Sequence, residues 1–259
     1  MSELILTQRD EHIVTVVLNR PEKMNALTKG MWQRLGEVMD ELSADESIRC
    51  IVIRGAGDKS FAPGNDISEF EKERSNIEQA RAYGAIMHQT FATFERCPHP
   101  IVAMIHGICV GGGLEIAAMC DMRICGESSR LGAPIKQLAL VMSPMEMRGL
   151  FQLVGPATTL EILLEGRLLD AQEALQKGLV NRVVKDNKVE KETYATAQRI
   201  AEGAPLVARW HKKFVKRFYD PTPLTDTELD EGYQCYGTED FQIGYQSFLA
   251  KKKPVFKGK

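Results

Sequence analysis

A run of three glycines, Gly111 to Gly113, stands two residues before Glu115 in this 259-residue chain. An apolar stretch at 101–105 precedes the run and a helix-like segment at 116–119 follows it, which predicts a strand, a bare-backbone turn and a helix start. Without Cβ atoms, the glycines would let an acyl group lie against backbone N–H groups, and the helix N-terminus adds its positive dipole end. This pattern is typical of an oxyanion hole that stabilises an enolate oxygen, with the Glu115 carboxylate beside it.

The same residues also have ordinary structural explanations. Glycine runs occur in tight turns and where a helix packs closely on a strand. A glutamate in the first turn of a helix complements the helix dipole without taking part in chemistry. The run alone leaves both interpretations open, so other segments of the chain must decide between them.

The overall charge gives little attraction to polyanions. Lysine and arginine total 33 against 35 acidic residues, which gives a formal net charge of −2 at pH 7. Binding of a polyanionic ligand would therefore depend on local basic residues. One basic cluster lies at 211–217 on a predicted helix, and another lies at 251–259 in the tail. Both clusters fit solvated surfaces, and the first also leaves a nucleic-acid contact open.

The six cysteines indicate a reducing compartment. They form no CxxC pair and no spacing suited to zinc. We find no signal-peptide pattern before them, and the apolar runs are too short to cross a bilayer. We therefore expect free and mostly buried thiols, a cytoplasmic location, no membrane insertion and no metal site.

Apolar runs and helical patterns alternate along the first two thirds of the chain. The runs at 13–18, 51–53, 101–105 and 122–125 predict strands, and an amphipathic helix is predicted around 31–42. This alternation predicts an α/β fold of repeated ββα or βαβ units. From 149 onward the pattern is mostly helical, so we expect a core of about 190 residues followed by a helical C-terminal extension.

Three separated segments together carry a resemblance to a known family. They are residues 18–27, the loop Pro63 to Ile67, and the stretch from His106 through the glycine run to Asp121. In this order they resemble the crotonase (enoyl-CoA hydratase/isomerase) family, and the likeness continues through 166–180 and 248–257. Each segment alone is a weak signal, whereas the ordered set is specific.

The resemblance implies both an architecture and a class of substrate. The fold would be an α/β spiral of ββα units, with the core and acyl-CoA site in residues 1–190. Residues 191–259 would form a helical region for oligomerisation and pocket closure, and the assembly would be a homotrimer or a dimer of trimers. The substrate would be an acyl-CoA thioester of fatty acid metabolism. CoA would enter as part of that substrate, with no permanently bound cofactor. The near-neutral total charge argues against a nucleic-acid partner.

The family stabilises its thioester enolate with two backbone N–H groups, which correspond here to Asn65 and Gly112. Pro63 replaces a commoner alanine and has no N–H to give, but the expected donor is Asn65, so the oxyanion hole should survive. Lys23 would contact a CoA phosphate, although it is equally typical of a solvated turn. The residues expected to bind substrate or CoA are Lys23, Met24, Ala26, Ala62, Gly64, Asn65, Asp66, Ile67, Gly111 and Ile135.

The chain departs from the family pattern at one position of direct chemical consequence. Hydratases of the family hold water between two glutamates; Glu115 occupies the first position, and Ile135 occupies the second. A lone carboxyl group against apolar walls should have a raised pKa, which suits proton transfer near neutral pH. Possible replacements for the lost acid are Lys136, Ser143 and Glu146, each of which we expect to be structural.

Three functions remain open at this point. Enoyl-CoA hydratase-type chemistry, with Glu115 as acid and base, comes first because it is common in the family. A Δ3-Δ2-enoyl-CoA isomerase that uses Glu115 as its single base is the close alternative, because a 1,3-proton shift needs only one such group. A catalytically silent relative that binds acyl-CoA or RNA is the third, suggested by Ile135 and the basic cluster at 211–217.

Overall fold

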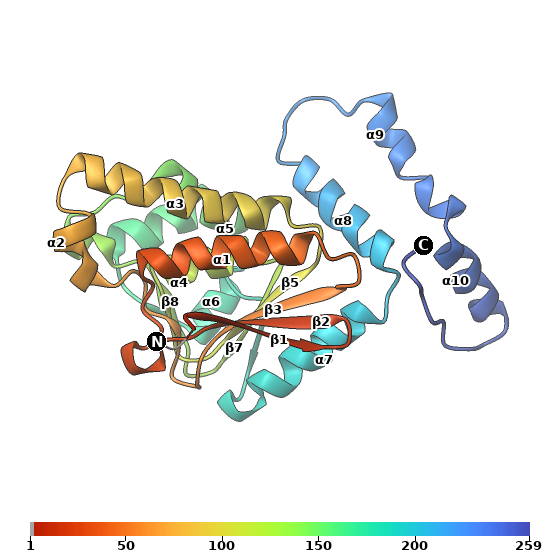
Figure 1. The fold of residues 1–259 in the computed structure, drawn as a ribbon, viewed down its shortest axis with the longest axis horizontal. Coiled ribbons are helices and arrows are strands. Elements are labelled where there is room, and N and C mark those ends of the chain that lie inside the picture. Colours follow the sequence, from red (N-terminus) through yellow and green to blue (C-terminus); the bar gives the residue numbers. More distant parts are fainter. Residues whose placement is uncertain (1–2) are drawn as a thin grey trace.

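Two β-sheets of unequal size form the centre of the molecule, for which a computed structural model describes residues 3–259 (Figure 1). All neighbouring strands are parallel except the pairs β1–β2 and β8–β9. The six-stranded sheet has the order β1 (Ile5–Asp10), β2 (Ile13–Leu18), β3 (Cys50–Gly55), β5 (Ile101–Ile105), β7 (Met122–Gly126) and β10 (Arg182–Val184). The four-stranded sheet has the order β4 (Ser60–Ala62), β6 (Ile108–Val110), β8 (Arg130–Gly132) and β9 (Leu169–Asp170).

Strands that follow one another along the chain enter different sheets. β3 leads into β4, β5 into β6, and β7 into β8, so each pair places one strand in the large sheet and one in the small sheet. A helix follows each pair: α3 (Ile77–Arg96), α4 (Gly112–Met119) and α5 (Pro144–Glu165). The repeating unit is therefore ββα, which confirms the predicted α/β spiral.

Both faces of the large sheet are covered at its inner strands, which explains why β2, β3 and β5 are apolar at nearly every position rather than at alternate ones. Ile51 and Ile53 belong to the core beneath α1 (Lys29–Ser43) and α3, whereas Val52 faces α7 (Val189–Ala201) on the other side. Only the first two residues of α7 lie within 1–190. The helix that opens the predicted C-terminal region thus packs on the sheet.

The remaining C-terminal helices form an arm beside the core (Figure 1). The arm carries exposed apolar side chains such as Phe218 and Phe248, whose exposed fractions are 72% and 82%. The arm helices are α8 (Pro205–Arg217), α9 (Asp226–Glu231) and α10 (Glu239–Leu249).

No helix in the described part of the chain is both long and apolar enough to span a membrane. The other helical elements are α2 (Phe70–Glu73), α6 (Ala171–Gln176), η1 (Pro21–Lys23), η2 (Ile67–Glu69), η3 (Ile135–Leu138), η4 (Asp186–Lys188) and η5 (Gln234–Gly237).

The glycine run follows a short strand that the sequence pattern did not indicate. We predicted a turn directly after 101–105, but β6 lies between that strand and the glycines. Gly107 makes the corner between the two sheets with φ +56°, and a Cβ there would lie 1.9 Å from the carbonyl oxygen of Lys59. Because β6 has only three residues, it is too short to show a strand periodicity.

Candidate active site

The glycine run begins α4 and packs closely against β4 and α1. Gly111 has φ +52° and ψ −122°, a backbone conformation that only glycine adopts readily. A Cβ on Gly113 would lie 2.3 Å from the carbonyl oxygen of Ala62, and a Cβ on Gly112 would lie 2.9 Å from the ring of Trp32. Packing therefore requires these glycines, and the same packing brings the start of α4 against the loop after β4.

Two backbone amides on neighbouring segments border one cavity. Gly112 is the first residue of α4, where an amide has no carbonyl partner within the helix. Asn65 pairs with Leu27 in an isolated parallel bridge. Leu27 bonds to the carbonyl of Gly64 and the amide of Asp66, both at 2.8 Å, so the N–H of Asn65 itself points away from Leu27. A Cβ on Gly64 would lie 3.5 Å from the Gly112 nitrogen, so the two segments are in contact.

The Asn65 side chain is fixed by a tryptophan of α1. Trp32 donates its indole N–H to Asn65 Oδ1 at 2.7 Å, and the Trp32 side chain is fully buried. This bond holds the loop that carries the Asn65 amide, because a buried indole N–H needs an acceptor. The sequence showed Trp32 only as an apolar helix residue, since nothing local links it to a loop 33 positions away.

Glu115 is the buried titratable group of this site. Its residue is 7% exposed, and among residues 3–259 its Oε2 atom has no hydrogen-bond partner. The pKa of Glu115 is raised to about 8, chiefly by burial; the negative charge of Glu146 contributes to the rise, and the positive charge of Arg74 opposes it. The raised pKa that we expected for a lone carboxyl group is confirmed, and the carboxyl group is protonated at neutral pH.

The cavity that joins these groups has a volume of about 180 Å³. Ile135, in η3, supplies an apolar wall at the position where the family resemblance implies a second glutamate. The other apolar walls come from the segment at 138–142, where Met142 is buried and Val141 is exposed. The cavity is lined by Pro63, Gly64, Asn65, Ile67, Phe70, Arg74, Val110, Gly111, Gly112, Glu115, Pro134, Ile135, Leu138, Leu140, Val141, Met142 and Glu146.

The predicted CoA contacts divide into two groups. Gly64, Asn65, Ile67, Gly111 and Ile135 line the cavity, as just described. The remaining five do not line the cavity: Lys23, Met24, Ala26, Ala62 and Asp66.

Each residue of the second group has a definite structural setting. Lys23 and Met24 lie on an exposed turn, where Met24 has φ +56°. Ala62 is buried in β4 against the glycine run. Asp66 caps η2 by accepting from the Ser68 amide. The Asp66 carboxylate also pairs with Arg20, whose guanidinium bonds to the Ala26 carbonyl oxygen as well.

Of the three possible replacements for the missing glutamate, one lines the cavity. Lys136 donates to the Leu164 carbonyl oxygen at 2.9 Å, and it does not line the cavity. Ser143 caps α5. Glu146 lies in the first turn of α5 with its side chain at the cavity.

Arg74 is a cavity residue that sequence reasoning missed. Its guanidinium lies over the rings of Phe70 and Tyr83, with ring-centroid distances of 4.8 and 4.9 Å. These cation–π contacts hold a positive charge near Glu115. The local sequence is rich in charge, so no signal distinguished Arg74 from its solvated neighbours.

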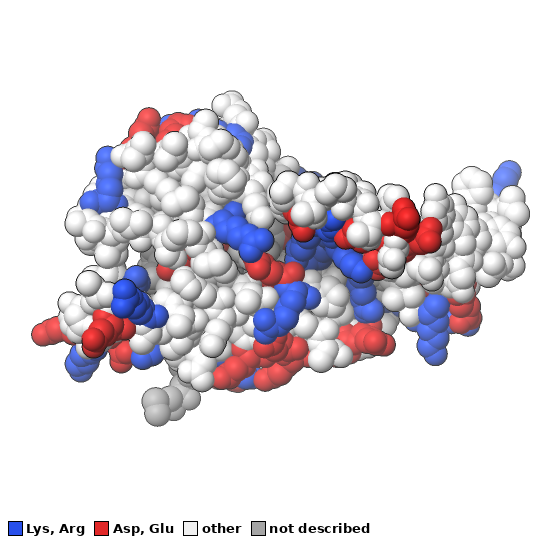
Figure 2. All heavy atoms as spheres, turned by 90° about the horizontal axis from the view of Figure 1, so that it is seen from above, with Lys and Arg blue, Asp and Glu red and all other residues white. Residues whose placement is uncertain are grey.

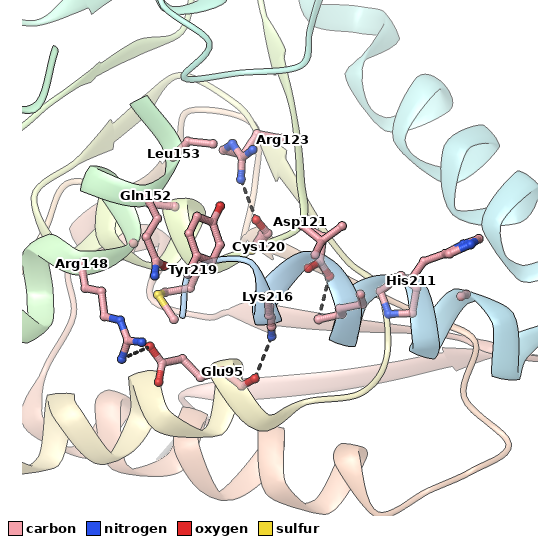
Figure 3. Close-up of a pocket in the computed structure, with 17 residues that line it drawn as sticks. Glu95, Cys120, Asp121, Arg123, Arg148, Gln152, Leu153, His211, Lys216 and Tyr219 are labelled. Atoms are coloured by element: carbon pink, nitrogen blue, oxygen red, sulfur yellow. Dashed lines mark hydrogen bonds and ion pairs between the residues drawn. The ribbon is translucent and has the colours of Figure 1, made fainter. Parts of the chain in front are cut away.

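A larger cavity of about 570 Å³ lies at the opposite end of α4 (Figure 3). The charged groups that line it are bonded to their surroundings. Arg148 pairs with Glu95 at 3.1 Å, Lys216 donates to the Glu95 carbonyl oxygen at 2.7 Å, and Arg123 donates to that of Cys120 at 2.6 Å. This cavity contains neither of the two amides nor Glu115, so it is separate from the candidate active site.

The basic cluster at 211–217 is largely bonded within the protein. Lys212 pairs with Asp121, and Lys213 pairs with Glu231. Arg217 pairs with Glu228. On the face shown in Figure 2, basic and acidic side chains lie next to one another rather than in a field of one sign.

Comparison with known proteins decides the family. The family model described as "Enoyl-CoA hydratase/isomerase" matches residues 8–259. The chain belongs to the enoyl-CoA hydratase/isomerase family. A crystal structure of an enoyl-CoA hydratase/carnithine racemase from Magnetospirillum magneticum is 49% identical, covers 100% of this chain and 97% of its own, and superposes with a TM-score of 0.98.

Curated members of the enoyl-CoA hydratase/isomerase family align along the same length. A crotonyl-CoA hydratase from Syntrophomonas wolfei is 31% identical over 98% of both chains. A short-chain-enoyl-CoA hydratase from Clostridium acetobutylicum is 30% identical over 96% of this chain and 95% of its own. The protein is therefore an enzyme of the hydratase/isomerase kind, and an acyl-CoA thioester substrate fits its family.

Proposed function

We propose that the protein is an enoyl-CoA hydratase-type enzyme that works through a thioester enolate, with Glu115 as its acid and base. The observation that carries this proposal is the meeting of two amide-bearing segments and one buried carboxyl group at a single cavity. The N–H groups of Asn65 and Gly112 would bind the thioester oxygen. Their effect would be large because backbone donors in a buried site need no reorganisation as charge develops.

The protonation state of Glu115 supports a role as proton donor. Addition of water to the β-carbon of an enoyl thioester moves the π electrons onto the thioester oxygen, giving the enolate. Glu115, protonated at neutral pH, then gives its proton to the α-carbon. The Ile135 side chain offers no acceptor for the proton that water must lose, so another group of the cavity must take it.

The isomerase alternative is favoured by one observation, the apolar residue at position 135. Conversion of a 3-enoyl to a 2-enoyl thioester requires a single group that removes a proton from the α-carbon and returns it to the γ-carbon. Glu115 could do both from one face of the dienolate, and Ile135 would then simply shape the acyl pocket.

The surrounding residues take supporting roles in this proposal. Lys23, Met24, Ala26, Ala62, Asp66 and Ile67 would form the entry for CoA, with Lys23 at a phosphate. The exposed apolar side chains of the arm, such as Phe248, support assembly into a homotrimer or a dimer of trimers. The free and mostly buried cysteines support a cytoplasmic location. The internal pairing of the basic cluster speaks against the RNA-binding alternative.

A panel of 2-enoyl, 3-enoyl and malonyl-type CoA thioesters tests the proposed reaction. Incubation with the protein, followed by mass and absorbance measurement, separates the outcomes, because hydration adds the mass of one water and isomerisation adds none. We expect the 2-enoyl thioester to gain one water. Lack of turnover of every thioester, together with salt-sensitive binding of RNA, would favour the silent relative instead.

The pH dependence of the reaction distinguishes an acid from a base. Since the pKa of Glu115 is about 8, an acid role predicts that ionisation of Glu115 does not limit kcat/KM for hydration below pH 8. Above that pH, kcat/KM should fall by about tenfold per pH unit as the carboxyl group ionises. A base role predicts the reverse, with kcat/KM rising toward pH 8 and levelling above it. Initial rates between pH 5 and about 10 decide between the two.

Replacing Ile135 with Glu should raise hydration relative to isomerisation. The new carboxylate would enter the same cavity as Glu115 and provide an acceptor for the water proton. A general base is typically worth about 10²-fold or more in rate, and this value is the upper limit of the gain because another group of the cavity already takes the water proton. The measurement is the ratio of hydrated to isomerised product from one enoyl-CoA, with Ile135→Gln as the uncharged control. An unchanged ratio would mean that the missing carboxylate does not limit water addition.

A further inference from the structure

Glu146 is a second carboxyl group held in a fixed place by the start of α5. Ser143 is the N-cap of this helix, and its hydroxyl accepts from the Glu146 amide at 3.4 Å. In return, Glu146 Oε2 accepts from the Ser143 amide at 2.9 Å. This reciprocal capping box restricts the Glu146 side chain to one position. The Ser143 hydroxyl is itself 3.2 Å from His88 Nε2, which braces the cap from α3.

The Glu146 side chain is held at the wall of the candidate active site. Glu146 and Glu115 line the same cavity, and the charge of Glu146 acts on the pKa of Glu115. Only Oε2 of Glu146 is used by the capping box. Within residues 3–259 no hydrogen bond or ion pair uses its other oxygen, Oε1. One carboxylate oxygen thus anchors the side chain, and the other remains for a ligand in the cavity.

The two carboxyl groups of the cavity differ in their surroundings. Burial keeps Glu115 protonated at neutral pH, so that it can give a proton. Glu146 is half-buried, and its Oε2 accepts from a backbone amide at a helix N-terminus. Its other oxygen, Oε1, is the atom that can accept a proton in the cavity. Addition of water requires one group that gives a proton and one that takes a proton.

We propose that Glu146 is the second proton-transfer group of this site, supplying from α5 the carboxylate that Ile135 lacks. This inference rests on the proposed hydratase-type function. In the addition step, an O–H bond of water breaks and its proton passes to Glu146. The water oxygen bonds to the β-carbon, and the π electrons move to the enolate. Glu115 then gives its proton to the α-carbon. The product has gained one water, and the proton on Glu146 returns to Glu115 through solvent.

The substitution Glu146→Gln tests this role while preserving the helix cap. Glutamine also serves at the third position of a capping box, so α5 should keep its start. We expect kcat for hydration to fall by about 10² to 10⁴, with KM changed by less than about threefold. The limb of the pH profile that reports the base should also disappear, an effect that a merely structural residue would not produce.

Two further variants separate chemistry from folding. Ser143→Ala removes the capping hydroxyl but keeps the backbone amide that holds Glu146, so we expect a lower melting temperature with hydration retained within a few-fold. Adding Ile135→Glu to Glu146→Gln should restore part of the lost hydration, because it returns a carboxylate to the same cavity. Glu146→Asp also keeps a carboxylate at the helix start, but one methylene short of its position. If Glu146→Gln does not fold, the kcat of Glu146→Asp shows how much hydration is lost when the carboxylate is displaced in a folded protein.

The possible results are distinguishable. Hydration by Glu146→Gln at the wild-type rate, with Glu115→Gln inactive, would overturn the role of Glu146 and leave the proposed function standing. Absence of turnover by the wild-type protein on every enoyl-CoA would instead overturn the proposed function itself. Loss of activity in Glu146→Gln without recovery by Ile135→Glu, and with an unchanged pH profile, would also contradict the inference, because it would indicate a structural effect.

Discussion

Glu115→Gln is expected to lower kcat for the best enoyl-CoA substrate by about 10² to 10⁴, because the amide has the same shape but cannot give a proton to the α-carbon. Substrate binding should change little, since the substitution leaves the two backbone amides in place. The measurement is steady-state kinetics on the thioester that the wild-type protein turns over fastest. Glu37→Gln, an exposed change on α1, is the matched control and should be silent.

The stability of the same variant provides an independent check. The pKa of Glu115 is about 8 in the folded protein, against 4.5 for an ordinary glutamate. The wild-type protein therefore loses stability as pH rises through this interval, because the buried carboxyl group must ionise. Glutamine does not ionise, so the free energy of unfolding of Glu115→Gln should exceed that of the wild-type protein at pH 9. Turnover by Glu115→Gln at the wild-type rate would show that another group moves the proton.

Gly112→Ala should have a similarly large effect through the oxyanion hole. The added Cβ would lie 2.9 Å from the Trp32 ring and 3.1 Å from Leu27, so either the start of α4 or the Asn65 loop must move. Loss of one oxyanion donor typically costs about 10² to 10³ in rate. We therefore expect at least that loss in kcat, measured on the same thioester.

A matched glycine substitution separates this effect from general damage. At Gly30 a Cβ would meet its nearest neighbour at 3.8 Å, an ordinary contact, so Gly30→Ala should keep full activity. Circular dichroism and thermal unfolding report whether Gly112→Ala remains folded. A folded Gly112→Ala protein with wild-type kcat would show that this turn does not bind the thioester oxygen.

Features encoded by neighbouring residues were readable from the sequence. The apolar runs of β2, β3 and β5 identified buried strands, because both faces of their sheet are covered. The glycine run and Glu115 were also recognised together, because they are close in the sequence. Glu115 lies in the first turn of the helix that the glycines begin. The pKa of Glu115 followed from the apolar residues expected around it.

Features that depend on tertiary placement were not readable. Trp32 and Asn65 meet only because α1 packs beside the loop after β4. Arg74 has no local mark that separates it from nearby charges, and the strand β6 is too short for a periodic pattern. Glu146 was expected to be structural from its position. Its capping role confirms part of that expectation, while its place at the cavity depends on how α5 packs against α4.

The most direct test of the account is a crystal structure of the protein with a bound enoyl-CoA analogue. The account predicts that the thioester oxygen lies about 2.7 to 3.2 Å from the amide nitrogens of both Asn65 and Gly112, with the α-carbon facing Glu115. A thioester bound in the larger cavity near Lys216, or one whose oxygen meets neither amide, would contradict the account.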